Sequence, residues 1–265
     1  MKIILTGSRV NLGRHISGLK EFDFLPVDRS NWNTLNLIKE SEYQAVIHCA
    51  YDLKKNINDV PDEVLDSNLL STARLLRVCK EKRIDNFIFV SSCAVYGDSS
   101  NSSEEKMCQP VTFNGHTKLF NEELVKHFCL ENKINYLILR VFNMFGGDDH
   151  FSVVQRLINC AKNGKEFTLM NDGVSERDFI YVKDVANILS QLINLNLKNE
   201  IINVGSGESV RIIDVLRAVE NKFGKVKTNQ KSNPNEAVFS RANIKKLRSL
   251  IQYKPTSIAD YINNL

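Results

Sequence analysis

Short apolar runs rich in β-branched residues recur along the chain and alternate with patterns typical of helices. The runs span residues 2–6, 22–27, 45–50, 86–92 and 135–141. The two longest helical patterns, at about 62–81 and 115–131, lie between them. Strands that alternate with helices are joined by crossover connections, so the pattern predicts an α/β fold with a doubly wound parallel sheet. After Gly147 the alternation is less regular, which indicates a small C-terminal α/β lobe.

The composition is that of an ordinary globular protein. A chain of 265 residues can bury a large core, as one large domain or one domain with a small lobe. No apolar run approaches the roughly 20 residues of a membrane helix, so we expect no membrane association. The net charge of +4 does not indicate nucleic-acid binding, although it could attract an anionic substrate such as a diphosphate.

The cysteines and the first residues bear on the compartment. The six cysteines are scattered without a C-x-x-C pair, so we expect reduced thiols and no metal site. The first apolar run is short and leads directly into a glycine turn, which favours a strand over a signal peptide. These features predict a cytoplasmic protein.

The first strand runs into a turn bounded by Gly7 and Gly13, and a helical pattern follows. Free backbone N–H groups and the dipole of a helix start both attract anions, so this turn is a candidate phosphate site. An ordinary strand–helix turn would give the same pattern.

The second strand ends in Asp28 and Arg29, 15 positions after Gly13. A carboxylate at this place would hold the diol of a ribose, which favours NAD. Arg29, and Arg9 in the glycine turn, could instead meet the 2′-phosphate of NADP. The choice between NAD and NADP therefore stays open, and all three side chains could also be ordinary turn or surface residues.

Two segments in the middle of the chain carry a more specific pattern. The fourth strand ends in Ser91-Ser92-Cys93-Ala94-Val95-Tyr96-Gly97, and the second segment reads Asn114-Gly115-His116-Thr117-Lys118. They resemble the S-S-x-x-V-Y-G and Y-G-x-S-K motifs of the extended short-chain dehydrogenase/reductases, the NAD-dependent epimerase/dehydratase family. The resemblance implies a Rossmann-type fold and hydride exchange between a nicotinamide and a sugar carbon. Ser92 and Lys118 match the motifs, whereas Asn114 occupies the position of the catalytic Tyr.

The resemblance extends over nearly the whole chain. Thr6, Gly7 and Gly13 fit the loop T-G-x-x-G-x-x-G, with Val10 in place of the middle glycine. Further matches are V-I-H-x-A at 46–50, L-R-x-x-N at 139–143, R-D-F-I-Y-V at 177–182 and N-V-G-S-G-E-S-V at 203–210. The cofactor contacts that the resemblance implies are Gly7, Arg9, Leu12, Gly13, Asp28, Arg29, Leu37, Ala50 and Lys118. The implied substrate contacts are Ser92, Asn143 and Arg177.

Two residues within these matches have a structural alternative. Arg177 commonly meets the sugar diphosphate in the family, but it could equally form a salt bridge with Asp178 or Asp184. His48 is more often a packed strand residue than a catalyst in such a setting.

The residue at position 114 is the main departure from the family. A hydroxyl loses hydride only as its proton leaves, so a base must lie at hydrogen-bond distance, and an Asn amide cannot accept that proton. Another group, such as His116 or Tyr96, could supply the proton, or a water held by Asn114, Ser92 and Lys118 could do so. Alternatively, Asn114 is an introduced change, or the protein binds its ligands without turnover.

These features predict an NAD(P)-dependent enzyme that transfers hydride at C4 of a nucleotide-linked sugar. The 4,6-dehydratases that the chain resembles carry an acid pair at the positions of Cys93 and Ala94, so the resemblance does not favour that activity. The remaining activities are those of a 4-ketoreductase or a 4-epimerase in deoxysugar and surface polysaccharide biosynthesis. The alternative is a catalytically impaired member that binds NAD(P) and sugar nucleotide without turnover.

The expected domains follow the same resemblance. Residues 1–142 and about 182–205 would form the NAD(P)-binding Rossmann domain, and 143–181 and about 206–265 the substrate-binding lobe. The partner would be a nucleotide-diphosphate sugar. A homodimer could form if the helices at 62–81 and 115–131 of two copies paired in a four-helix interface.

Overall fold

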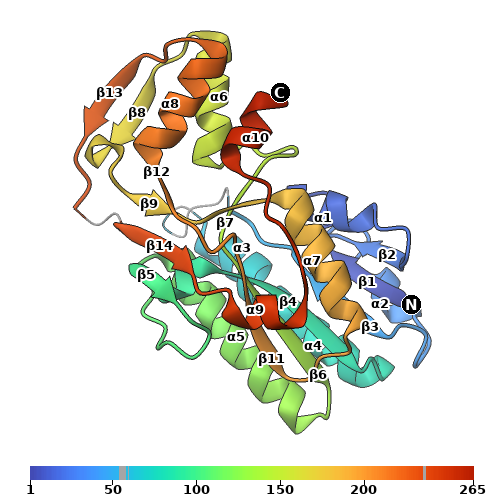
Figure 1. The fold of residues 1–265 in the computed structure, drawn as a ribbon. Helices are drawn as coiled ribbons and strands as arrows, with labels where there is room; N and C mark the ends of the chain where they lie inside the picture. The colour runs from blue at the N-terminus through green and yellow to red at the C-terminus, as the bar shows by residue number, and fades with distance from the viewer. Residues whose placement is uncertain (54–57, 59, 235–236) are drawn as a thin grey trace.

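The centre of the molecule is a parallel sheet in the computed structural model, which describes residues 1–53, 58, 60–234 and 237–265. Within these residues the sheet has six strands in the order β11-β6-β4-β3-β1-β2 (Figure 1). They are β1 (Lys2–Thr6), β2 (Asp23–Val27), β3 (Ala45–His48), β4 (Asn86–Ser92), β6 (Asn135–Val141) and β11 (Glu200–Val204). Every neighbouring pair is parallel, which confirms the predicted doubly wound sheet.

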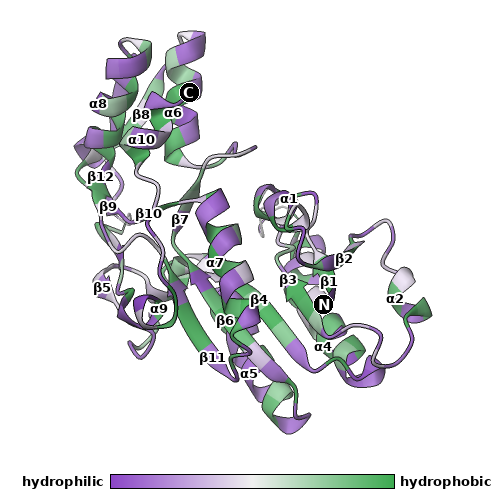
Figure 2. Cartoon of the chain, turned by 45° about the vertical axis from the view of Figure 1, so that its right-hand side comes forward, coloured by the Kyte–Doolittle hydropathy of each residue, from purple (hydrophilic) through white to green (hydrophobic). Residues whose placement is uncertain are grey.

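Helices cover both faces of this sheet. One face packs against α1 (Asn11–Ser17), α7 (Val182–Asn194) and α9 (Lys245–Leu250), and the other against α2 (Thr34–Leu37), α4 (Ser71–Lys82) and α5 (Phe113–Glu131). In β1, Ile3 and Leu5 face the first set and Ile4 faces the second, and all three are fully buried. Burial on both sides explains why the strands read as continuous apolar runs (Figure 2).

The predicted long helix that starts at Pro61 is interrupted. It consists of α3 (Pro61–Leu65), a π-helical turn η1 (Asp66–Leu70) and α4. The predicted helix at 115–131 starts two residues earlier, because the Thr112 hydroxyl accepts a hydrogen bond from the N–H of Gly115 and caps α5 at Phe113.

A smaller group of elements has its own apolar cluster, at the upper left of Figure 1. It contains β8 (Phe167–Met170) paired in parallel with β13 (Thr228–Lys231), and three helices, α6 (Val153–Asn163), α8 (Ile212–Phe223) and α10 (Ile258–Asn263). The short helical turn η3 (Asn171–Gly173) follows β8. The inward residues of this apolar cluster include Phe145, Leu157 and Val215.

Short strands connect the two groups. β7 (Asn143–Phe145) pairs with β10 (Phe179–Tyr181), and a four-stranded sheet has the order β12 (Val210–Arg211), β9 (Glu176–Arg177), β14 (Phe239–Ala242) and β5 (Ser99–Ser102). After β14 the chain returns to the large sheet, where Ala242 and Leu247 join the apolar cluster beside α7. The polar segment 98–112 has the composition of a loop, yet its residues Ser99–Ser102 form a strand that pairs with β14.

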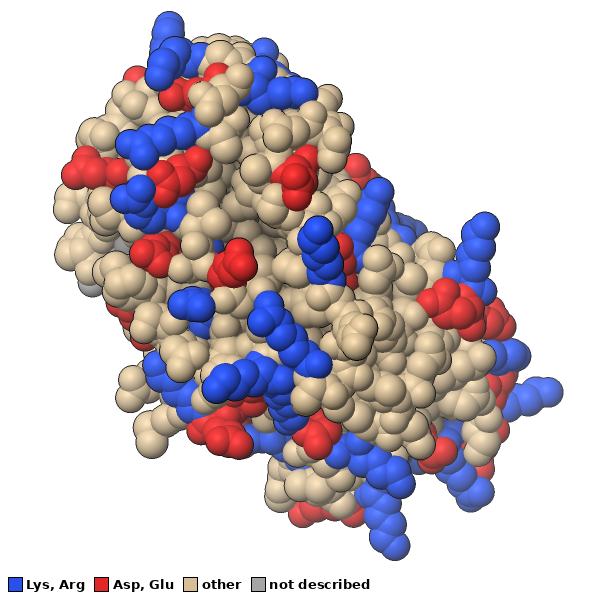
Figure 3. All heavy atoms as spheres, viewed as in Figure 1, with Lys and Arg blue, Asp and Glu red and all other residues tan. Residues whose placement is uncertain are grey.

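The surface carries charges of both signs. On the face shown in Figure 3, Lys and Arg side chains are interspersed with Asp and Glu, as is typical of a surface in contact with water. No helix in the part of the chain that the structure describes is both long and apolar enough to cross a membrane.

Candidate active site

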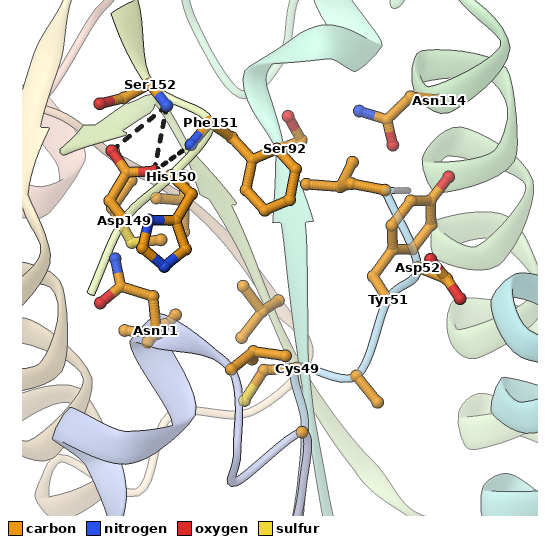
Figure 4. A pocket seen from close by; sticks show the side chains of 18 of the residues that line it. Asn11, Cys49, Tyr51, Asp52, Ser92, Asn114, Asp149, His150, Phe151 and Ser152 are labelled. Carbon is orange, nitrogen blue, oxygen red and sulfur yellow. Dashed lines mark hydrogen bonds between the residues drawn. The ribbon is translucent and has the colours of Figure 1, made fainter. Parts of the chain in front are cut away.

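A cavity of about 1660 Å³ opens at the carboxyl ends of β1, β3, β4 and β6 (Figure 4). β2 and β3 lie on opposite sides of β1, so the strand order reverses here, and ligands of open α/β sheets bind at such a point. A drug-sized ligand usually occupies roughly 300–1,000 Å³. The cavity therefore has room for two ligands side by side.

The glycine turn after β1 forms one wall. Gly7 has φ +75°, and a Cβ there would lie 2.7 Å from the backbone nitrogen of Ala50. A Cβ on Gly13 would lie 1.9 Å from the carbonyl oxygen of Gly7. Both positions therefore require glycine. Val10 does not disrupt the turn, since its N–H donates to the Gly7 carbonyl at 3.0 Å while its side chain lines the cavity.

The end of β2 places a carboxylate on the cavity wall. The Asp28 carboxylate accepts hydrogen bonds from Ser30, which lower its pKa, and lies 2.9 Å from Arg9 Nε. Arg29 donates to the Asp52 carboxylate at 3.0 Å. Both arginine charges are thus compensated by carboxylates, which favours a ribose diol over a 2′-phosphate beside Asp28.

Lys118 and Ser92 both line the cavity. Lys118 on α5 is 6% exposed, and its Nζ donates to the carbonyl oxygen of Val90 in β4 at 2.8 Å. Burial lowers the pKa of this ammonium to about 8. Ser92 follows in the same strand, and its Oγ accepts a hydrogen bond from the N–H of Ala94 at the start of the short helical turn η2 (Cys93–Tyr96).

Asn114 lies one helical turn before Lys118 on α5 and also lines the cavity. Among the described residues its Oδ1 is buried and has no hydrogen-bond partner. An unpaired buried acceptor costs roughly 1–3 kcal/mol. This oxygen is therefore available to a hydroxyl group of a ligand or of a neighbouring side chain.

The opposite wall includes the short strands that connect the two groups of elements. Asn143 in β7 donates from Nδ2 to the carbonyl oxygen of Asp178 at 2.9 Å, and Arg177 in β9 donates to the carbonyl oxygens of Glu176 and Val238. Both line the cavity. The Asp178 carboxylate accepts hydrogen bonds from the N–H and hydroxyl of Ser206 and from the N–H groups of Gly207 and Ala242, so these contacts are structural.

The structure brings together most of the residues predicted for the site. The cavity is lined by Gly7, Arg9, Leu12, Asp28, Arg29, Ala50, Ser92, Asn114, Lys118, Asn143 and Arg177. Gly13 lies buried beneath the turn, as its contact with Gly7 requires. Leu37 is the exception: it is 82% exposed on α2 and does not line the cavity, so the prediction that it contacts the cofactor has no support in its position.

Two proposed substitutes for the missing phenol are also placed elsewhere. His116 is exposed and does not line the cavity. Tyr96 does not line the cavity; its hydroxyl donates to Asn203 Oδ1 at 2.8 Å and accepts from Arg140. His48 is a packed strand residue, bonded to the hydroxyls of Thr6 and Thr72, and burial lowers its pKa to about 3.

Several aromatic residues that were not predicted for the site line the cavity, among them Tyr51 and Phe151 (Figure 4). Tyr51 directly follows Ala50, so the V-I-H-x-A match already placed a phenol one residue past the end of the motif. Phe151 lies just before α6, which starts at Val153 because the Ser152 hydroxyl caps it by accepting from the N–H of Gln155.

Comparisons with known proteins were made for the whole chain. The model of the NAD-dependent epimerase/dehydratase family matches residues 5–205. The chain is 32% identical over 203 residues to YtcB of Bacillus subtilis, described as an uncharacterised UDP-glucose epimerase; the match covers 74% of this chain and 64% of that protein. It is 28% identical over 230 residues to a putative UDP-glucose 4-epimerase of Methanocaldococcus jannaschii, covering 83% and 72%.

A solved structure has the same fold over nearly the full chain. It is a variant of the UDP-glucuronic acid 4-epimerase of Bacillus cereus in complex with UDP-4-deoxy-4-fluoro-glucuronic acid and NAD. The TM-score is 0.88 at 27% identity, and the match covers 99% of this chain and 96% of that one.

Proposed function

The chain belongs to the NAD-dependent epimerase/dehydratase family, and we propose that it transfers hydride at C4 of a nucleotide-linked sugar. The observation that carries this proposal is the convergence of Ser92 and Lys118 at the end of β4, in a cavity large enough for a dinucleotide and a sugar nucleotide. Relatives described as epimerases of UDP-sugars support the same assignment.

NAD would occupy the side of the cavity formed by β1, β2 and β3. Gly7 and Gly13 keep the backbone close to its diphosphate, and the Asp28 carboxylate accepts from a ribose diol. When bound, the nicotinamide exchanges hydride with the substrate. Lys118, whose charge is held beside Val90, donates to the ribose next to the nicotinamide. The paired charges of Arg9 and Arg29 make NAD the favoured cofactor over NADP.

The sugar nucleotide would occupy the opposite side. Ser92 holds the reacting sugar oxygen, and Arg177 and Asn143 contact the diphosphate and the sugar. Farther into the smaller lobe, the Arg156 guanidinium lies 5.3 Å from the ring centre of Phe167. A planar cation above an aromatic ring, with Met170 beside it, suits a nucleobase.

Proton transfer separates the two activities in this family. Reduction of a 4-keto sugar needs one proton donor, whereas epimerisation needs a group that first removes a proton and then returns it. Asn114 does neither. A 4-ketoreductase of deoxysugar and surface polysaccharide biosynthesis therefore fits this site better than a 4-epimerase. The second candidate, a protein that binds both ligands without turnover, is favoured by Asn114 alone.

The wider organisation belongs to the same proposal. Residues 1–142 and about 182–205 would bind the cofactor, 143–181 and about 206–265 the substrate, and the protein would act in the cytoplasm. A homodimer would pair the outer faces of α4 and α5, where Phe113, Phe120 and Leu130 are 42%, 58% and 57% exposed. Light scattering would detect it, and Phe120→Glu should yield monomers.

Binding measurements test the two-ligand cavity. We expect NADH fluorescence to change on binding, with weaker binding of NADPH, and calorimetry to detect one of the UDP-, dTDP-, CDP- or GDP-sugars. Arg177→Gln should weaken the sugar nucleotide at least about tenfold, since it removes a charge opposite a diphosphate. Arg217→Gln is the matched control, because Arg217 lies on α8 paired with Asp214, away from the cavity. Absence of binding by every nucleotide tested would contradict the proposal.

A further inference from the structure

The site keeps the Ser and the Lys of the family motif but has no phenol at position 114. Among the described residues that line the cavity, one tyrosine is present, and it comes from a different element. This residue is Tyr51, in the segment that follows β3.

Tyr51 lies against Lys118, which a phenol at position 114 would also neighbour. Its ring centre is 4.3 Å from Lys118 Nζ. In Figure 4 the ring lies beneath Asn114, on the same side of the cavity, with Ser92 across from both. The Asn114 side chain is short, so the wall formed by α5 has room for a ring supplied from elsewhere.

The Tyr51 hydroxyl points toward α5 and lies near the side chain of Thr117; burial raises the pKa of this phenol, and Thr117 lowers it in part. Thr117 is the residue before Lys118, and its own hydroxyl donates to the carbonyl oxygen of Phe113. The phenol O–H is therefore held next to the helix that carries Lys118 and Asn114, within the polar part of the cavity.

The backbone beside Tyr51 is fixed from the same helix. Asn68 in the π-helical turn η1 is 3% exposed, and its amide bonds both the N–H and the carbonyl oxygen of Asp52, at 2.8 and 3.0 Å. Asn121 on α5 in turn donates to the carbonyl oxygen of Asn68 at 2.6 Å. These contacts tie the position of Tyr51 to that of α5, so the ring is held in place before any ligand binds.

We propose that Tyr51 supplies the phenol of this active site and is its proton-transfer residue. The inference rests on the proposed function. In the reducing direction, Tyr51 turns from Thr117 and gives its O–H proton to the C4 carbonyl oxygen held by Ser92, as C4 receives hydride from the reduced nicotinamide. The π bond of C4=O is replaced by a new C–H and a new O–H bond while the C–O single bond remains, and the nicotinamide is oxidised by loss of the hydride. The phenolate that remains lies beside the Lys118 ammonium and regains its proton from water.

Asn114 has a defined part in this arrangement. Its Oδ1, unpaired and buried within the described structure, can accept the Tyr51 O–H before the substrate binds, and the substrate carbonyl oxygen then takes the place of this acceptor. In this arrangement the phenol comes from the segment after β3, whereas α5, which carries the Tyr in the family motif, supplies the amide of Asn114.

Kinetics of Tyr51→Phe test this role, because the change removes only the hydroxyl and keeps the ring against Lys118. With NADH and the 4-keto sugar nucleotide that the protein reduces fastest, kcat should fall at least about 100-fold, as expected for loss of a general acid. The Kd for NADH, measured by fluorescence, and the KM should stay within about twofold, since no ground-state contact is lost. Tyr43→Phe is the matched control, at the opposite end of β3 and outside the cavity.

A pH profile separates proton transfer from packing. The unchanged protein should lose kcat at alkaline pH as the phenol ionises, and this limb should be absent from the residual activity of Tyr51→Phe. If Tyr51→Phe keeps kcat within about threefold of the unchanged protein, the proposal is overturned while the proposed function stands.

The activities of variants that carry Asn114→Tyr distinguish the remaining outcomes. If the double variant Tyr51→Phe/Asn114→Tyr recovers the lost kcat, the two phenols do the same work, which supports the proposal. If the unchanged protein is inactive and Asn114→Tyr is active, Tyr51 does not deliver the proton and the proposal fails alone. If neither reduces any 4-keto sugar nucleotide, both the proposal and the proposed function fail.

Discussion

Glu122→Gln should destabilise the protein severely, although Glu122 does not touch the cavity. The carboxylate is fully buried, and it accepts hydrogen bonds from Arg140 Nη2 at 2.7 Å, from Arg140 Nε at 3.1 Å, and from the Ser91 hydroxyl. The Arg140 side chain is itself only 4% exposed. Removing one charge of a buried pair leaves the other uncompensated, which costs roughly 3–5 kcal/mol.

The loss can be measured by urea denaturation, followed by the fluorescence of the single tryptophan. Glu123→Gln is the control. The Glu123 side chain is 62% exposed and pairs with Lys126 on the surface, so removing its charge should cost less than about 1 kcal/mol. A domain of ordinary stability has roughly 5–15 kcal/mol in total, so Glu122→Gln should still fold, with a lower urea midpoint and an unchanged slope.

A paired substitution separates the buried charge from lost packing. Glu122→Leu combined with Arg140→Met removes both charges, and such replacements are often neutral or stabilising. The double variant should therefore be more stable than Glu122→Gln. A loss below about 1 kcal/mol for Glu122→Gln would refute the reasoning, because it would mean that water or another group compensates Arg140.

Three further predictions concern the cavity. Gly7→Ala should lower the melting temperature and weaken NADH binding, since its φ is +75° and the added Cβ would lie 2.7 Å from Ala50; thermal shift and fluorescence would show this. Asp28→Ala should reduce the preference for NADH over NADPH at least about tenfold in the same titration, since the ribose diol loses its acceptor. For Lys118, burial lowers the pKa from 10.5 to about 8, so the cost of burying its charge is fully present below pH 8 and is relieved as the pH rises towards 10.5. Compared with Lys118→Met, the unfolding free energy of the unchanged protein should therefore gain up to about 3 kcal/mol across this window, measured by urea denaturation at each pH.

The sequence predicted best what continuous apolar runs determine. The strands at 86–92 and 135–141 have the predicted bounds. Residues such as Phe87 and Ile138 are buried between two helical layers, so the apolar run is continuous and its ends mark the ends of the strand. The glycine turn was also predictable, since Gly7 and Gly13 each occupy a place with no room for a side chain.

Contacts between distant segments escaped the sequence. Ser99–Ser102 has no apolar alternation and forms a strand only because β14, some 140 residues later, pairs with it. The π-helical turn at Asp66–Leu70 interrupts a pattern that reads as one helix, and it places Asn68 in the interior instead of on the solvated face usual for a mid-helix Asn.

The site residues likewise divide into those that a sequence motif identifies and those that only the fold brings together. Ser92 and Lys118 could be found from their motifs, since their spacing fixes them on one strand and one helix. Tyr51 could not be assigned to the site in this way, because its position beside Lys118 depends on the fold of the segment after β3 and on the hydrogen bonds of Asn68. Leu37 was misplaced because alignment to a motif does not fix where a short helix at the sheet edge lies.

Transfer of deuterium tests the central claim most directly. The protein would be incubated with NADH that carries two deuterium atoms at the nicotinamide C4 and with a panel of nucleotide-linked 4-keto sugars, and the products would be read by NMR. We predict deuterium at C4 of the reduced sugar with at least one nucleotide. Binding of both ligands without deuterium at C4, in the unchanged chain and in Asn114→Tyr alike, would contradict the account.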